Sequence, residues 1–269
     1  MDLGLREATV AVNGGSKGMG RAAAEALAAE GARVAVLART RGDLDDTVTA
    51  LRKLGAAEAL AIEVDITVPG QVAAAFAELD RRWGSLNLLV NAAGPVGVGV
   101  GPFATVTDEE WLATMDVGLL GAVRCVRAAL PLLRRAEWAR IVNVSAHSTR
   151  RQSPDLVAYT AAKAAFSSLS KNLSVSLAPE GILVNTVSPG SFLSPGLRGY
   201  LEALPPERGV DPGDLQDAMR VIAEDFGHPA HLGRAGEVGE IGPVIAFVGS
   251  RVNSYMTGAD INVDGGSDF

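Results

Sequence analysis

Residues 8–31, ATVAVNGGSKGMGRAAAEALAAEG, pass from a β-branched run through a cluster of glycines into an alanine-rich segment. The β-branched run predicts a buried strand over 8–14, and the alanine-rich segment predicts a helix over 20–31 that a glycine closes. The glycines between them include Gly14, Gly18 and Gly20. Glycine at a strand-to-helix turn lets the backbone approach a phosphate group closely, at the positive end of the helix. The stretch predicts an α/β unit with a site for an anion at its turn.

The rest of the chain repeats this alternation of β-branched runs and amphipathic, alanine-rich segments. Further strands are predicted over 33–39, 58–66, 86–94, 139–146, 182–190 and 260–266. Helical patterns fill the intervals, among them 69–84, which opens with proline and closes with glycine. Repeated βαβ units make a parallel sheet with helices on both faces. We therefore predict one doubly wound, seven-stranded parallel sheet, which binds ligands beyond the carboxyl ends of its strands.

Composition limits the kinds of partner and the cellular setting. A chain of 269 residues with 48% hydrophobic residues can form one large α/β domain, here taken as residues 1–269. The net charge of −7 and the lack of a Lys or Arg run predict no nucleic-acid partner and no anionic membrane partner. The N-terminus lacks a signal-peptide pattern, and no apolar run reaches the roughly 18 residues of a membrane span. We expect a cytoplasmic protein.

The single cysteine, Cys125, excludes an internal disulfide and a cysteine-based metal cluster. It lies in a helical pattern and is interpreted as a small buried hydrophobic residue. No metal site is predicted.

Three more strand ends carry polar or glycine-rich motifs. They are VDIT with Asp65, NAAG over 91–94, and the YTAAK segment that holds Tyr159 and Lys163. Together with the glycine loop, VNTVSPG over 184–190 and TGADINVDGG over 257–266, they make the chain resemble the short-chain dehydrogenase/reductase family, with a likeness to its 3-oxoacyl-carrier-protein reductases. The resemblance runs from about residue 9 to the C-terminus. It implies a Rossmann-type single domain, a nicotinamide cofactor and hydride transfer between an alcohol and a carbonyl.

Tyr159 and Lys163 are four residues apart, so a helix over 158–177 places them one turn apart on one face. A tyrosine has an ordinary pKa of about 10, and a nearby cation favours its phenolate. The resemblance implies that Tyr159 donates a proton to the substrate oxygen and removes it in the reverse direction. It implies that Lys163 tunes Tyr159 and bonds the cofactor ribose.

Two positions depart from the family pattern. The family's catalytic serine lies thirteen residues before the tyrosine, and that position here is Ala146; the family's asparagine position is Gly118. Losing one donor to the substrate oxygen costs roughly 100- to 1000-fold in rate. Ser148 is the preferred replacement, because residues beyond a strand end can turn back over the cofactor. Ser145, expected to face away from the Ala146 side, and His147, interpreted as a solvated loop residue, are the alternatives.

The end of the second predicted strand points to NADP(H). NAD enzymes of this family carry an acidic residue there, whereas this chain has Ala38 followed by Arg39. Lys17 adds a second cation near the same place, and Thr40 and Arg41 follow. Two cations without a carboxylate match a 2′-phosphate.

The resemblance also assigns the remaining contacts. The positions it gives to the cofactor are Gly14, Ser16, Lys17, Gly18, Met19, Gly20, Arg39, Thr40, Asp65, Ile66, Asn91, Ala92, Ala93, Gly94, Tyr159, Lys163, Pro189, Gly190, Phe192 and Ser194. Residues 191–234 are too long for an ordinary connection and are interpreted as a substrate-binding lid. By analogy with the family we expect a homotetramer or homodimer, with the helices near 105–135 and 159–178 and the C-terminal VDGG segment (263–266) at interfaces.

Three functions stay open at this stage. The first is an NADPH-dependent carbonyl reductase or alcohol dehydrogenase acting on a small molecule, with 3-oxoacyl thioesters, steroids and small cyclic ketones all admissible. The second is a redox-impaired NADP(H)-binding sensor or assembly protein, suggested by Ala146 and Gly118. The third is a dehydratase or epimerase that uses Tyr159 and Lys163 for proton transfer alone.

Overall fold

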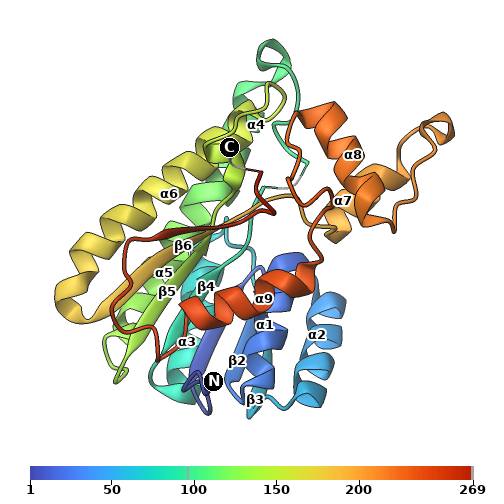
Figure 1. Ribbon diagram of the computed structural model, residues 1–269. Helices are drawn as coiled ribbons and strands as arrows, with labels where there is room; N and C mark the ends of the chain where they lie inside the picture. The colour runs from blue at the N-terminus through green and yellow to red at the C-terminus, as the bar shows by residue number, and fades with distance from the viewer. Residues whose placement is uncertain (96, 268–269) are drawn as a thin grey trace.

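Seven parallel strands form a single sheet in the computed structural model, which describes residues 1–95 and 97–267. The order across the sheet is β3-β2-β1-β4-β5-β6-β7 (Figure 1). The strands are β1 (Thr9–Asn13), β2 (Arg33–Ala38), β3 (Glu58–Glu63), β4 (Leu88–Asn91), β5 (Ala139–Val144), β6 (Ile182–Pro189) and β7 (Asp260–Val263). The predicted doubly wound parallel sheet is confirmed.

Most strands end earlier than the sequence pattern predicts. β4 stops at Asn91 rather than at residue 94, and β3 stops at Glu63 rather than at residue 66. Val64 and Ala92 each still donate one backbone hydrogen bond to the neighbouring strand, to Ala38 O (2.8 Å) and Asn13 O (2.9 Å), and the chain leaves the sheet after them. The residues that follow form the loops at the carboxyl edge, where the candidate site lies.

Helices cover both faces of the sheet (Figure 1). They are α1 (Gly18–Ala29), α2 (Arg41–Leu54), α3 (Pro69–Trp83), α4 (Asp108–Met115), α5 (Gly121–Leu133), α6 (Val157–Leu177), α7 (Pro195–Glu202), α8 (Leu215–Phe226) and α9 (Val238–Val248). A π-helical turn, Asp116–Leu120, joins α4 to α5, and short 3₁₀ turns include η3 (His147–Thr149).

Alternate residues of each strand serve two separate cores, because successive strand side chains point to opposite faces. Val10 and Val12 pack in the cluster with α1, α2 and α9, whereas Ala11 packs in the cluster with α3 and α5. Cys125 is fully buried in the second cluster, and burial raises the pKa of its thiol to about 12. It is a structural residue, as predicted.

From β1 the chain adds β2 and β3 on one side, then crosses to β4 on the other side of β1 and continues to β7. The connections that follow the neighbouring strands β1 and β4 therefore lead in opposite directions. Such a switch opens a crevice between the connections at the carboxyl ends of the two strands. The 191–234 segment lies above this edge and carries α7 and α8 (Figure 1). It has a small core of its own around Leu201, Met219 and Val221.

No helix in the described part of the chain has the length and apolar character needed to cross a bilayer.

Candidate active site

The loop between β1 and α1 makes two close approaches that require glycine. Gly14 has a φ of 75°, and a Cβ on it would lie 2.6 Å from the backbone N of Ala93. A Cβ on Gly20 would lie 2.2 Å from the backbone O of Gly14. The loop therefore folds tightly against the end of β4 and brings the first turn of α1 to the crevice.

The start of α1 is suited to an anion. The helix has no side-chain cap and no acidic residue in its first turn, so nothing there neutralises the positive end of its dipole. Gly18 has a φ of 54°, and a Cβ on it would reach no closer than 3.9 Å to Ser194 and Pro195. Of the other loop residues, Ser16 is buried and Met19 is partly buried against the core. These features fit the pyrophosphate of a dinucleotide.

The cations at the end of β2 differ from the sequence expectation. Lys17 Nζ lies 2.8 Å from Asp43 Oδ2, because α2 brings Asp43 beside the glycine loop. The prediction that no carboxylate lies near Lys17 is therefore wrong. Arg41 pairs with Asp45, also on α2. Within the described residues Arg39 makes no ion pair, and its side chain is exposed beside Thr40 at the end of β2.

Asp65 follows β3 and is held by Thr67. Its Oδ1 accepts hydrogen bonds from the backbone N (2.9 Å) and the Oγ1 (2.7 Å) of Thr67, and these bonds lower the pKa of Asp65. The Ile66 side chain is buried against Gly121, where an added Cβ would lie 2.4 Å from Ile66 Cδ1. Ile66 therefore packs against α5, which leaves its backbone as the part that can face the adenine.

Lys163 joins α6 to the ends of two strands. Its Nζ donates a hydrogen bond to the backbone O of Val144 (2.9 Å), at the end of β5. The same Nζ lies 3.4 Å from the position of a Cβ on Gly94, beyond β4. Tyr159 lies one turn earlier on α6 and is partly exposed. The predicted pair is thus at the carboxyl edge of the sheet, beside the NAAG segment.

Burial dominates the titration of this pair. It raises the pKa of Tyr159 to about 12 and lowers the pKa of Lys163 to about 8. The expectation that Lys163 lowers the pKa of Tyr159 is not met. The physical reason is that burial disfavours both the phenolate and the ammonium, and the Lys163 ammonium is directed at Val144.

Ala146 occupies the serine position with an extended backbone, φ −162° and ψ 144°. Ser145 faces the other way, because its Oγ lies 2.7 Å from Ser167 Oγ and donates to the backbone O of Lys163. Its predicted orientation is confirmed. Ser148 lies in η3 and is 3% exposed, and its Oγ has no hydrogen-bond partner among the described residues.

His147 is not the solvated loop residue that the sequence suggested. It is 5% exposed, and its Nδ1 donates to the backbone O of Pro189 (3.0 Å) at the end of β6. Its ring meets that of His228 edge to face, with centroids 4.9 Å apart. Sequence reasoning missed His228, which the 191–234 segment brings in from a distant part of the chain and which no motif marks.

Gly118 lies in the π-helical turn and is tightly surrounded. A Cβ on it would lie 3.1 Å from Ala162 Cβ and 3.2 Å from Pro95 Cγ. Pro95, which directly follows the NAAG segment, therefore fills the space that the family's asparagine side chain would need. Sequence reasoning missed Pro95, although its place after Gly94 was a visible signal.

The last predicted contacts lie where β6 enters the 191–234 segment. A Cβ on Gly190 would lie 2.6 Å from the Cα of Asp264, so β6 ends in close contact with the loop after β7. The Phe192 ring is buried in the core against Gly236, which leaves its backbone as the part that can face a cofactor. Ser194 caps α7 by accepting from the backbone N of Leu197, and it lies across from Gly18.

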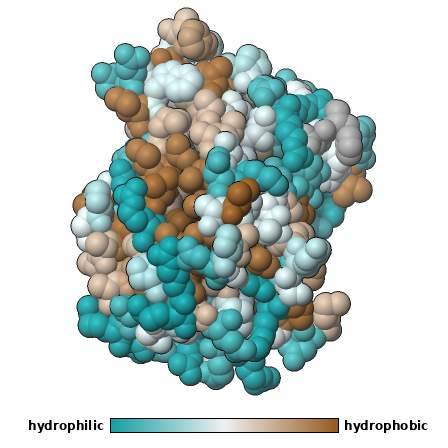
Figure 2. All heavy atoms as spheres, turned by 90° about the vertical axis from the view of Figure 1, so that its left-hand side faces the viewer, coloured by the Kyte–Doolittle hydropathy of each residue, from teal (hydrophilic) through white to brown (hydrophobic). Residues whose placement is uncertain are grey.

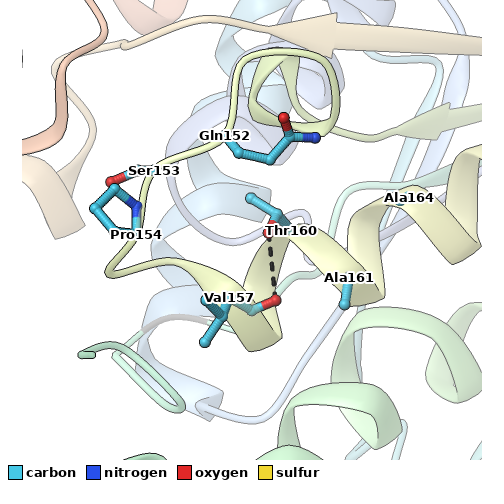
Figure 3. A pocket seen from close by; sticks show the side chains of 7 residues that line it. All are labelled: Gln152, Ser153, Pro154, Val157, Thr160, Ala161 and Ala164. Atoms are coloured by element: carbon cyan, nitrogen blue, oxygen red, sulfur yellow. Dashed lines mark hydrogen bonds between the residues drawn. The ribbon is translucent and has the colours of Figure 1, made fainter. Parts of the chain in front are cut away.

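A cavity of about 470 Å³ lies beside the loop from β5 to α6 (Figure 3). It is lined by Gln152, Ser153, Pro154, Val157, Thr160, Ala161 and Ala164. The α6 residues that line this cavity lie on one face of the helix. Tyr159 and Lys163 lie on a different face. Within residues 1–95 and 97–267, no group of three or more His, Cys, Asp or Glu side chains could hold a metal ion.

Comparison with known proteins agrees with this architecture. Residues 8–203 match the family model described as short chain dehydrogenase. The chain is 34% identical to the short-chain reductase protein NovJ of Streptomyces niveus over 261 residues, covering 97% of this chain and 94% of that protein. It is 32% identical to the 2,3-dihydroxy-2,3-dihydro-p-cumate dehydrogenase of Pseudomonas putida over 270 residues, covering 98% and 96%.

Among solved structures, L-sorbose reductase from Gluconobacter frateurii, complexed with NADPH and L-sorbose, superposes with a TM-score of 0.91. That match has 27% sequence identity and covers 100% of this chain and 99% of the other. The glycine loop, the Tyr159/Lys163 pair and these likenesses lead to one assignment: the chain belongs to the short-chain dehydrogenase/reductase family.

Proposed function

We propose that this protein is an NADP(H)-dependent oxidoreductase that interconverts a carbonyl and a secondary alcohol, with Tyr159 as the acid and base. The observation that carries the proposal is the position of Tyr159 and Lys163, one turn apart on α6, with Lys163 Nζ against Val144 and Gly94. The pair thereby reaches the crevice where the glycine loop can hold a dinucleotide.

The described residues fit the cofactor in three places. The glycine loop and the uncapped start of α1 would hold the pyrophosphate, and the backbone beyond β4 would lie under the adenosine ribose. Lys163 is near enough to Gly94 to bond the nicotinamide ribose. When bound, the nicotinamide supplies or accepts the hydride.

The proton step belongs to Tyr159. In reduction its hydroxyl donates a proton to the substrate oxygen, and in oxidation the phenolate takes the proton back. Because burial raises the pKa of Tyr159 to about 12, the hydroxyl keeps its proton near neutral pH, which suits the reductive direction. Ser148 donates the second hydrogen bond to the substrate oxygen, in place of the side chain that Ala146 lacks.

NADP(H) is favoured over NAD(H) because the exposed Arg39 guanidinium follows β2 where a 2′-phosphate would lie. The sorbose reductase, which has the same fold, is complexed with NADPH. We predict that Arg39→Ala weakens NADPH binding about 10- to 100-fold and changes NADH binding much less, since one charged hydrogen bond is lost. Fluorescence titration of the reduced nicotinamide measures both constants.

Arg41→Ala is the matched control, because Arg41 is already paired with Asp45. It should change neither constant by more than about threefold. Equal losses for NADPH and NADH in the Arg39 variant would show that Arg39 does not read the 2′-phosphate.

The direct test of the function is single-turnover oxidation of NADPH across a panel of ketones, followed at the absorbance of the reduced nicotinamide. The wild type should oxidise NADPH with at least one ketone, and Tyr159→Phe should reduce that rate about 100-fold or more while leaving NADPH affinity within about threefold. A Tyr159→Phe protein as active as the wild type would refute the assigned role.

A second function is favoured by the surroundings of Gly118. Pro95 and Ala162 fill the asparagine position, so the water chain that this side chain supports in the family has no such anchor here. A redox-impaired NADP(H)-binding protein would show tight NADPH binding and no oxidation with any ketone. Product formation without net oxidation of NADPH would instead indicate a dehydratase or epimerase.

We also propose that the 191–234 segment acts as the substrate lid. Its two ends lie side by side, where Leu193 N bonds Gly236 O and Gly236 N bonds Ser191 O, and Leu232 N also bonds Gly265 O after β7. Its own core around Leu201 and Met219 lets it act as a unit above the crevice.

A further inference from the structure

Three buried polar atoms around the segment that follows β5 have no hydrogen-bond partner among residues 1–95 and 97–267. They are Ser148 Oγ, Ser153 Oγ and His228 Nε2, and each residue is 3% exposed. Buried polar atoms are nearly always paired in folded proteins, because leaving one unpaired destabilises the folded state. Three such atoms, in η3, in the loop after it and in the segment that packs on His147, are candidates to pair with a bound ligand.

His228 is brought to this place by two structural features. α8 ends at Gly227, which has a left-handed backbone with φ 69° and turns the chain back toward the sheet. Beyond His228, Leu232 N bonds the backbone O of Gly265 after β7 (3.1 Å). The ring is thus fixed from both sides and packs edge to face on His147.

The His228 contact places these atoms beside the proposed reaction site. His147 directly follows Ala146, the position of the family's serine, and its Nδ1 bonds Pro189 at the end of β6. Ser148 belongs to the same 3₁₀ turn, and Ser153 lies four residues beyond that turn, at the cavity next to α6. In Figure 3 the Ser153 hydroxyl points away from Thr160 and out of the α6 stripe.

The chemistry of the three atoms defines the ligand. A serine hydroxyl both donates and accepts, and a neutral imidazole carries one donor and one acceptor nitrogen, as does a ligand hydroxyl group. Burial, and then the neighbouring His147, lower the pKa of His228, which favours the neutral imidazole. Ligand hydroxyl groups, which both donate and accept, can pair with all three atoms, whereas an alkyl chain would leave them unpaired.

We propose that Ser153 and His228 bind hydroxyl groups of the substrate while Ser148 donates to its carbonyl oxygen, so that the protein acts on a polyhydroxylated ketone or the corresponding polyol, with His228 as a specificity-determining residue. The inference rests on the proposed function, because it places the hydroxyl groups beside the carbonyl that Tyr159 protonates. It goes further by assigning a substrate class and a residue from the 191–234 segment.

Two six-carbon ketones test the inference by turnover. The wild type should have a higher kcat/KM with D-fructose than with 2-hexanone, and His228→Phe should lower the ratio of the two values about 30-fold, since phenylalanine keeps the ring but offers no hydrogen bond. His228→Gln, which places an amide near the Nε2 position, should recover most of the ratio. His231→Phe, a change at an exposed histidine of the same segment, should leave the ratio unchanged.

Calorimetric binding of D-sorbitol to the NADP⁺-saturated protein gives a readout without turnover. The wild type should bind it, and His228→Phe should weaken binding about 10-fold or more. A wild type that prefers 2-hexanone, a ratio unaffected by His228→Phe, or no sorbitol binding would each overturn the inference while leaving NADPH-dependent reduction intact. Sorbitol binding that depends on His228, without NADPH oxidation by any ketone, would uphold the hydroxyl site and refute the proposed redox function.

Discussion

At the scale of single residues, Ala146 is the main departure from the family, and Ser148 is the nearest compensation. The Ala146 methyl is 5% exposed and offers no hydrogen bond, whereas Ser148 keeps a buried Oγ without a partner in the described chain. A hydroxyl without a partner breaks no hydrogen bond within the protein when it donates to a substrate oxygen.

We predict that Ser148→Ala lowers kcat/KM about 100-fold for the ketone that the wild type reduces best, with little change in NADPH affinity. The double variant Ala146→Ser/Ser148→Ala should have a kcat/KM at least tenfold higher than Ser148→Ala, because it returns a hydroxyl to the family position. Steady-state kinetics on the three proteins measures this. An unchanged kcat/KM in Ser148→Ala would exclude Ser148 as a donor.

Substitution of Lys163 provides a second test, because we expect it to raise the free energy of unfolding while it abolishes turnover. Burial lowers its pKa from 10.5 to about 8, so at pH 7 folding must bury a charge at a cost of about 3 kcal/mol. Between pH 8 and 10.5 the unfolded chain binds the proton and the folded chain does not, so stability rises with pH through this range.

We predict that Lys163→Met raises the free energy of unfolding at pH 7 by about 1 to 3 kcal/mol, abolishes turnover, and gives a smaller stability gain at pH 9.5. The loss of the hydrogen bond to Val144 is included in that range. Urea unfolding at the two pH values measures the difference. A gain independent of pH would show that the buried charge is not its cause.

At the scale of elements, the glycine loop shows how a short motif depends on distances between backbones. Gly20→Ala would place a Cβ 2.2 Å from the backbone O of Gly14, and neither group can move without displacing α1 from β1. Gly42 lies in the first turn of α2, and a Cβ there meets nothing within 4 Å.

We therefore predict that Gly20→Ala destabilises the fold by about 2 kcal/mol or more and weakens NADPH binding at least 10-fold. Gly42→Ala should be neutral or stabilise by about 0.5 to 1 kcal/mol, since alanine is the better helix former. Thermal unfolding with and without NADPH compares the two. Equal effects would mean that the loop tolerates a side chain at residue 20.

The spacing of apolar residues predicted which segments are helices and which are strands. It did not predict the residues at which these elements end. The alternation of apolar residues gave all seven strands and their parallel arrangement, because hydrophobic period reflects burial directly. The ends of β3 and β4 were overestimated, because Ile66 and Ala93 look like strand residues but lie in loops. A residue belongs to a strand only if it hydrogen-bonds to the neighbouring strand. The local sequence pattern carries no information about that neighbour.

At the scale of the whole molecule, one face is suited to self-association. α6 exposes Ala161, Ala164 and Val175 along it, and the side chain of Leu112 on the adjacent α4 is 71% exposed. Hydrophobic residues gather in the upper part of this face in Figure 2. Small side chains on a helix allow a second helix to approach closely, so this face is where we expect the predicted homodimer or homotetramer to form.

We predict that Ala164→Arg converts the assembly to a smaller species, because a charged side chain would be buried against the partner helix. Ala74→Arg, the same change at an exposed position of α3, should leave the assembly intact. Light scattering coupled to size-exclusion chromatography gives both masses. A wild type that is already monomeric would refute the expected assembly.

The sequence by itself determined the fold, the glycine loop, and the positions of Tyr159 and Lys163, because hydrophobic period and residue spacing along one helix or one turn are local properties. The tertiary structure decided which charges are paired, as with Lys17 and Asp43, and which spaces are filled, as with Pro95 beside Gly118. It also brought His228 against His147. These contacts join segments far apart in the chain, and their distances depend on how the elements pack.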